Sequence, residues 1–187
     1  IKNIFLLFVF IISAIMIIGG VKKYYLKAYV KRTPMITFID DDGMRASAES
    51  WERISDSTGI AVTMAIITNR MGLVTDINEY MSWEDVERLS SKGFEFISHT
   101  NNHIVITEAS DEDLIKDFEE TKRLLDENGC NSDFLVFPQN ASDERSLRIV
   151  EKYFKASFCG ANLVNVPPID RYKITRVNLM DFSKKPL

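Results

Sequence analysis

The first residues of this sequence that could do chemistry are three consecutive aspartates, Asp40, Asp41 and Asp42, followed by Gly43. Adjacent carboxylates repel one another, so such a cluster favours a bound cation or a general base. An Asp-Gly turn with a helix N-cap explains the same residues without any chemistry. This segment taken alone therefore leaves both interpretations open.

The two histidines of the chain, His99 and His103, are four residues apart. On one helical turn, histidines at this spacing point the same way and can bind one ion. With one carboxylate they would leave coordination positions open for water and substrate. An isolated H-x-x-x-H is a weak signal, but here it follows one predicted strand while the aspartates follow another. This placement favours a metal site.

The elements that must position these side chains alternate along the sequence from residue 34 onward. Short β-branched or aromatic segments are followed by amphipathic ones, which is typical of an α/β fold with parallel strands. The predicted strands are 35–40, 61–67, 94–98, 134–137, 156–159 and 173–177. The predicted helices are 46–57, 83–92, 111–128 and 143–153, with Ser82 and Ser110 as N-caps of the second and third.

Active sites of parallel α/β folds form beyond the carboxyl ends of the strands. The aspartates follow the first predicted strand and the histidines follow the third. Pro138, Gln139 and Asn140 follow the fourth strand, and backbone N–H groups in this turn could stabilise an oxyanion. An ordinary strand-to-helix loop is the simpler interpretation of that turn taken alone.

The N-terminal segment predicts a membrane anchor. Residues 4–21 carry no charge, and about 18 apolar residues suffice to cross a bilayer. No small-x-small cleavage site precedes Lys22, which favours an uncleaved signal anchor, with residues 22–33 as a basic stalk and residues 34–187 as the catalytic domain. Basic residues follow the span while Lys2 alone precedes it, so the positive-inside rule by itself would keep the domain in the cytoplasm.

Composition excludes several other classes of protein. The net charge is −4, and no basic cluster interleaved with aromatics follows residue 32, so nucleic acid is not an expected partner. Cys130 and Cys159 lack C-x-x-C spacing, which rules out a zinc ribbon or a redox motif. One disulfide between them stays open.

Three segments together resemble the polysaccharide deacetylase family, also called carbohydrate esterase family 4. They are TFIDDDG, GFEFISHTNNH and FPQNASDE, and the resemblance extends over about residues 34–178. It implies a distorted (β/α) barrel that binds a divalent ion, usually zinc. It also implies hydrolysis of N-acetyl groups on the amino sugars of a cell-surface or cell-wall polysaccharide, such as peptidoglycan, by a domain outside the cell.

The resemblance also implies roles for individual residues. Asp42, His99 and His103 correspond to the metal ligands, Asp41 to the general base, and Gln139 to the backbone donor for the oxyanion.

The acidic motif has one residue more than the family pattern, so a shifted alignment would make Asp40 the base and Asp41 the ligand. We prefer the alignment anchored on Gly43, because this glycine sets the turn.

The sequence also departs from the family pattern. Gln139 and Asn140 replace an aromatic residue and a glycine, and no arginine precedes Pro138. The family's late L-x-H histidine, which protonates the leaving amine, has no counterpart after His103. Either the chain stops before it or the general acid is missing, and its loss would remove roughly 10²–10⁴-fold in rate. A membrane-tethered protein that binds metal and glycan without turnover is therefore the alternative function.

Overall fold

The computed structural model describes residues 36–179. The expected anchor and stalk, residues 1–33, lie outside this range. Within it, no helix has the length and apolar character that crossing a bilayer requires. Residues 36 and 165–169 belong to a separate unit from residues 37–164 and 170–179, and the second unit carries all the helices and strands named below.

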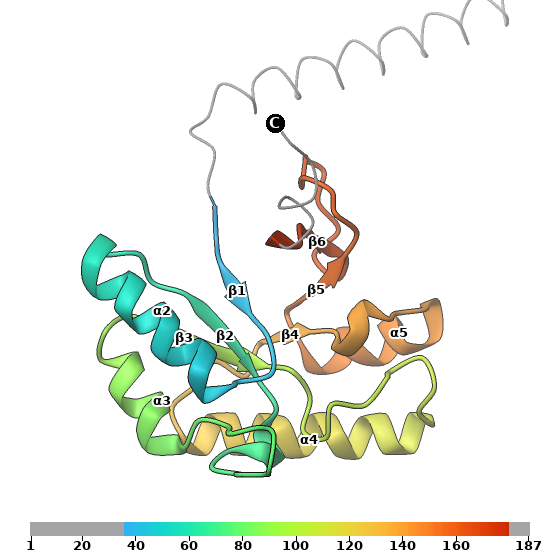
Figure 1. Cartoon of the computed structure of the whole chain (residues 1–187). Coiled ribbons are helices and arrows are strands. Elements are labelled where there is room, and N and C mark those ends of the chain that lie inside the picture. Colours follow the sequence, from blue (N-terminus) through green and yellow to red (C-terminus); the bar gives the residue numbers. More distant parts are fainter. Residues whose placement is uncertain (1–35, 180–187) are drawn as a thin grey trace, which may run out of the picture. The chain divides into compact units, whose positions relative to one another are not determined.

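Six parallel strands form one sheet in which the spatial order follows the chain. They are β1 (Ile39–Asp40), β2 (Thr63–Ile66), β3 (Glu95–Ser98), β4 (Phe134–Val136), β5 (Ala156–Gly160) and β6 (Ile174–Arg176). All six predicted strands are confirmed, although β1 is shorter than expected. The sheet curls (Figure 1), and within the described residues it is an open half-barrel, consistent with an incomplete (β/α) barrel.

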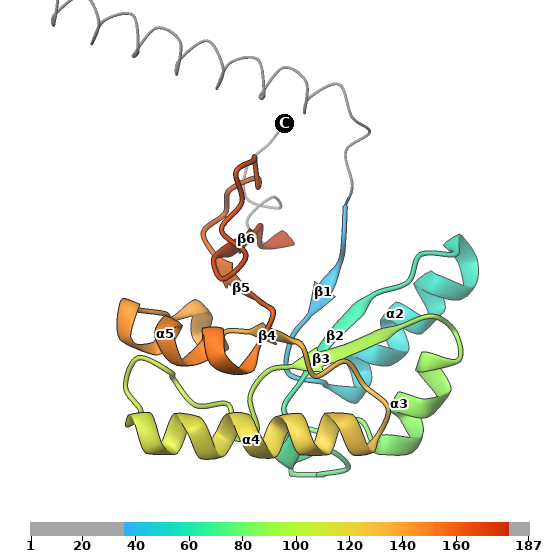
Figure 2. The same cartoon turned by 180° about the vertical axis from the view of Figure 1, so that it is seen from behind.

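Four α-helices connect the strands and lie outside the curled sheet, as Figures 1 and 2 show. They are α2 (Arg45–Thr58), α3 (Trp83–Ser90), α4 (Asp111–Glu127) and α5 (Glu144–Tyr153). The expected N-caps are confirmed, because Ser82 and Ser110 accept hydrogen bonds from backbone N–H groups in the first turns of α3 and α4. Two 3₁₀ turns were not predicted, η1 (Thr68–Arg70) and η2 (Pro138–Asn140).

Apolar side chains cover both faces of the central strands. Met64, Ile66 and Phe96 pack in one core cluster with residues of α2 and α3. Alternate positions such as Ala65 and Ile97 form a smaller cluster, because successive side chains of a strand point to opposite faces. Burial on both faces fixes these strands, and so holds their carboxyl ends at one edge of the sheet.

Candidate metal centre

The turn after β1 has an unusual backbone that directs the acidic cluster. Asp42 and Gly43 both adopt left-handed conformations, with φ of 75° and 76°. A Cβ atom on Gly43 would lie 3.1 Å from Cγ2 of Ile66. The turn therefore needs glycine for its conformation and for its close approach to β2.

The structure brings Asp42, His99 and His103 together. Asp42 Oδ1 lies 3.4 Å from His99 Nε2 and 3.3 Å from His103 Nε2. One possible ligand atom from each residue lies within 4.8 Å of the others. The Asp42 side chain is 45% exposed, so that water and substrate can reach this point from solvent.

His99 is oriented by two hydrogen bonds. Its backbone N–H donates to Ile66 O at 2.9 Å, and its ring Nδ1 lies 2.9 Å from Val136 O. A carbonyl oxygen can only accept, so Nδ1 carries a proton, and Nε2 is the ring nitrogen that faces Asp42. Histidines that bind metals commonly donate their second ring N–H to a backbone carbonyl in this way.

The protonation states at the site also suit a metal ion. Burial lowers the pKa of His103, which favours the neutral imidazole that ligates metals. The His99 ring lowers the pKa of Asp42 against the opposing effect of burial, which favours the carboxylate. A carboxylate oxygen and the Nε2 atoms of two imidazoles thus converge on one accessible point, and this set of ligand atoms fits a divalent ion such as zinc.

Asp41 points to a different partner from Asp42. Arg176, at the end of β6, donates from Nη1 to Asp41 Oδ1 at 2.6 Å and from Nη2 to Asp41 Oδ2 at 2.9 Å. The same Nη2 donates to Asn140 Oδ1 at 3.2 Å. Arg176 was not predicted as a site residue, and the only sequence signal was its place near the end of the last predicted strand.

Asp40 is held on α2. Its Oδ2 accepts hydrogen bonds from Ser47 Oγ at 2.7 Å and from Trp51 Nε1 at 2.9 Å. Since Asp40 is bound to α2 and Asp41 to Arg176, Asp42 is the carboxylate that lies beside the histidines. This geometry favours the assignment anchored on Gly43 over the shifted one.

The turn after β4 presents Gln139 at the surface. Gln139 and Asn140 adopt left-handed conformations, with φ of 53° and 58°. Within residues 36–179 the Gln139 N–H donates to no backbone or side-chain acceptor, so it is available to an oxygen of a bound molecule. The Asn140 side chain lies against Gly160, where a Cβ atom would be 2.5 Å away from it.

The two cysteines considered in the sequence are Cys130 and Cys159. Both are free thiols, so they form no disulfide.

Solved structures share this fold. The deacetylase PplD of Streptococcus pyogenes in complex with acetate superposes with a TM-score of 0.72 at 16% identity, covering 79% of this chain and 65% of that one. IcaB of Ammonifex degensii gives 0.69 at 19% identity, covering 85% and 74%.

A polysaccharide deacetylase of Bacillus cereus gives a TM-score of 0.65 at 18% identity, covering 76% of this chain but 46% of its own length. The chain thus spans about half the length of that protein. No curated protein sequence matches the chain. The family model for polysaccharide deacetylase, however, matches residues 27–154, which is more than half of the sequence. The chain belongs to the polysaccharide deacetylase family.

Proposed function

We propose that this chain is a metal-dependent hydrolase that removes N-acetyl groups from the amino sugars of a cell-surface or cell-wall polysaccharide. The observation that carries the proposal is the convergence of Asp42, His99 and His103 on one accessible point. The neighbouring carboxylate of Asp41, which is held by Arg176, would supply a base on the same turn.

Each of these residues has a task in the proposed reaction. Asp42, His99 and His103 would hold the ion, which supplies Lewis acidity by polarising a carbonyl oxygen and acidifying water. Asp41 would accept the proton of the attacking water, and its two hydrogen bonds with Arg176 orient the carboxylate.

The Gln139 N–H would donate to the oxygen that becomes negative when water adds to the amide carbonyl. This donor is exposed and has no acceptor among the described residues. The structure of the similar S. pyogenes deacetylase with acetate, the product expected of such a reaction, supports the proposed reaction class.

A second function keeps the site without turnover. The two histidines of this sequence are both assigned here as ligands, so neither of them can protonate the leaving amine. This observation favours a protein that binds metal and glycan.

We further propose that residues 4–21 anchor the chain in the cell membrane and that the domain faces outward, where such glycans lie.

The test compares three adjacent carboxylates in the full chain. Asp42→Asn should lose both bound zinc and acetate release from N-acetylglucosamine oligomers, because it removes a ligand. Asp41→Asn should keep zinc and lose on the order of 10²–10⁴-fold in acetate release, because it removes the base. Asp40→Asn is the matched control and should keep both, since among residues 36–179 the Asp40 side chain bonds only to Ser47 and Trp51. Elemental analysis measures the zinc.

Two results would contradict parts of this proposal. Equal acetate release by Asp41→Asn and the unmodified chain would remove Asp41 from the role of base. A zinc-loaded unmodified chain that releases no acetate from any acetylated glycan would favour the binding function instead.

A further inference from the structure

The loop between the two ligand histidines has a backbone that its own residues do not favour. Thr100 and His103 adopt left-handed conformations, with φ of 65° and 55°. This conformation is rare for residues other than glycine, and most of all for a β-branched one such as Thr100. It persists only where the surroundings impose it. His103 lies at the end of this loop, so whatever holds the loop also sets the position of its ring.

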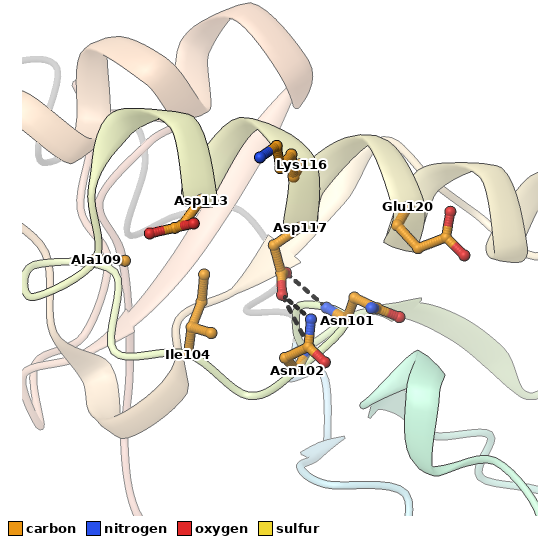
Figure 3. A pocket seen from close by; sticks show the side chains of 8 residues that line it. All are labelled: Asn101, Asn102, Ile104, Ala109, Asp113, Lys116, Asp117 and Glu120. Carbon is orange, nitrogen blue, oxygen red and sulfur yellow. Dashed lines mark hydrogen bonds between the residues drawn. The ribbon is translucent and has the colours of Figure 1, made fainter.

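Asp117 of α4 contacts this loop directly. Its Oδ1 accepts the backbone N–H of Asn101 at 2.7 Å. Its Oδ2 accepts both the backbone N–H and the side-chain amide of Asn102, each at 2.9 Å. Figure 3 shows the carboxylate pointing from the helix into the loop, with all three hydrogen bonds made to these two asparagines.

The opposite side of the loop is held by η1. Thr68 N donates to Thr100 O at 3.3 Å, and Asn69 N donates to Asn101 O at 3.2 Å. Thr68 Oγ1 also donates to Asn101 Oδ1 at 2.8 Å. The 3₁₀ turn thus binds the loop's carbonyl groups, whereas Asp117 binds two consecutive N–H groups. The two contacts are complementary.

Burial of the Asp117 carboxylate costs free energy, and the hydrogen bonds from the loop must offset this cost. The residue is 4% exposed, and it forms no ion pair within residues 36–179. In the described part of the chain its carboxylate accepts hydrogen bonds from the loop alone, and burial raises the pKa of this carboxyl group against their opposing effect. An apolar residue at this buried position of α4 would stabilise packing without that cost.

We propose that Asp117 is a positioning residue for the metal centre, which fixes the loop of residues 100–102 and thereby holds His103 beside Asp42 and His99. This inference rests on the proposed function, because it requires that His103 binds a metal ion. Asp117 itself would not contact the ion or the substrate. Its effect would pass through the backbone N–H groups of Asn101 and Asn102.

The experiment uses the full chain and two variants on the same helix. Asp117→Asn replaces one acceptor oxygen by a donor that faces the loop's N–H groups. Leu125→Ala is the matched control, because Leu125 is also buried on α4 but packs in the core cluster of Met64 and Phe96, which includes no residue of the loop. Zinc affinity is measured by competition with a chelator. Amide hydrogen exchange is measured on the metal-free chains.

We expect Asp117→Asn to weaken zinc binding by about 10–100-fold, the usual effect of losing a group that orients ligands. In the metal-free chain it should speed exchange of the Asn101 and Asn102 amides while the α4 amides keep their protection. Leu125→Ala should change neither reading, even if it lowers the unfolding midpoint. If Asp117→Asn does not fold, Asp117→Glu, whose carboxylate is displaced by one methylene, must show the same selective pattern.

The two proposals fail in different ways. If the unmodified chain and a His99→Ala variant bind zinc equally, the proposed metal centre is wrong. The exchange experiment still tests whether Asp117 fixes the loop, because it needs no metal. Protected Asn101 and Asn102 amides in Asp117→Asn would overturn the positioning role. So would equal losses of zinc affinity in Asp117→Asn and Leu125→Ala, which would show a merely structural role for the helix.

Discussion

Three adjacent aspartates have three different partners in this structure, and the difference comes from the backbone. Asp40 is the last residue of β1 and turns its carboxylate to α2. Asp41 follows the strand and meets Arg176, whereas the left-handed conformation of Asp42 carries its carboxylate to the histidines. Separate partners also relieve the repulsion that three neighbouring carboxylates would otherwise feel.

The pKa of His103 predicts a pH dependence of stability in the metal-free chain. Burial lowers this pKa from its ordinary value of 6.5, so the folded state favours the neutral ring more than the unfolded state does. Neutral His103 therefore contributes stability above about pH 6.5, and this contribution is lost as the pH falls through the lower folded pKa. The thermal midpoint of the metal-free chain should fall in that window.

The matched variant is His103→Gln, which has no proton to gain there. The thermal midpoint of this variant should change less with pH between about pH 6.5 and 5, the range below the ordinary histidine pKa. Protonation of Asp42 would lower stability only at a more acidic pH, because the pKa of Asp42 is lowered from 3.8. Equal slopes in the two chains over the higher window would show that His103 does not have the lowered pKa.

Among single residues, the proposed metal ligands are easier to predict from the sequence than the residues that hold them in place. Asp42, His99 and His103 lie in short motifs at strand ends, and the structure brings them together. Arg176 lies 135 residues after Asp41, so no local pattern links the two. Asp117 looks like any other acidic residue of a charged helix until the fold shows that it points inward.

The turn between β1 and α2 offers a test at the scale of elements. Gly43 and Gly59 both adopt left-handed conformations, with φ of 76° and 73°, but only Gly43 has neighbours close to where a Cβ would stand. Alanine at either position should cost about 1–2 kcal/mol from the backbone conformation. Gly43→Ala should lose more stability and also weaken zinc binding, because crowding by Ile66 would shift Asp42. Urea unfolding and zinc competition measure the two effects.

Gly59→Ala serves as the control, since nothing lies within 4 Å of its added methyl group and it ends α2 far along the chain from Asp42. Equal stability losses and unchanged zinc affinity in both variants would show that the close approach of Gly43 to β2 does not position the ligand.

The long elements could be predicted because their patterns repeat. Six strands and four helices were foreseen from alternating segments, with two N-caps at the residues expected. The turns η1 and η2 were not, since three residues are too few to show a period. They nevertheless matter to the site, because η1 binds the loop before His103 and η2 presents Gln139.

At the scale of the whole molecule, the fold and family are established for the part of the chain that the structure describes. The sheet, its strand order and the similar structures agree on a curled parallel sheet of the deacetylase type. The chain covers 46% of the B. cereus protein and 74% of IcaB. Substrate and location therefore call for experiments on the full chain in its cellular setting.

The last prediction concerns where the domain lies. Residues 4–21 are uncharged and long enough to cross a bilayer, so the full chain should fractionate with membranes. The basic residues 22–32 favour a cytoplasmic domain by the positive-inside rule, whereas a cell-wall glycan requires an outward one. We expect protease added to intact cells to degrade the domain, with permeabilised cells as the control for cleavability. Complete protection in intact cells, with cleavage after permeabilisation, would show that the basic flank decides the orientation and that the proposed substrate is wrong.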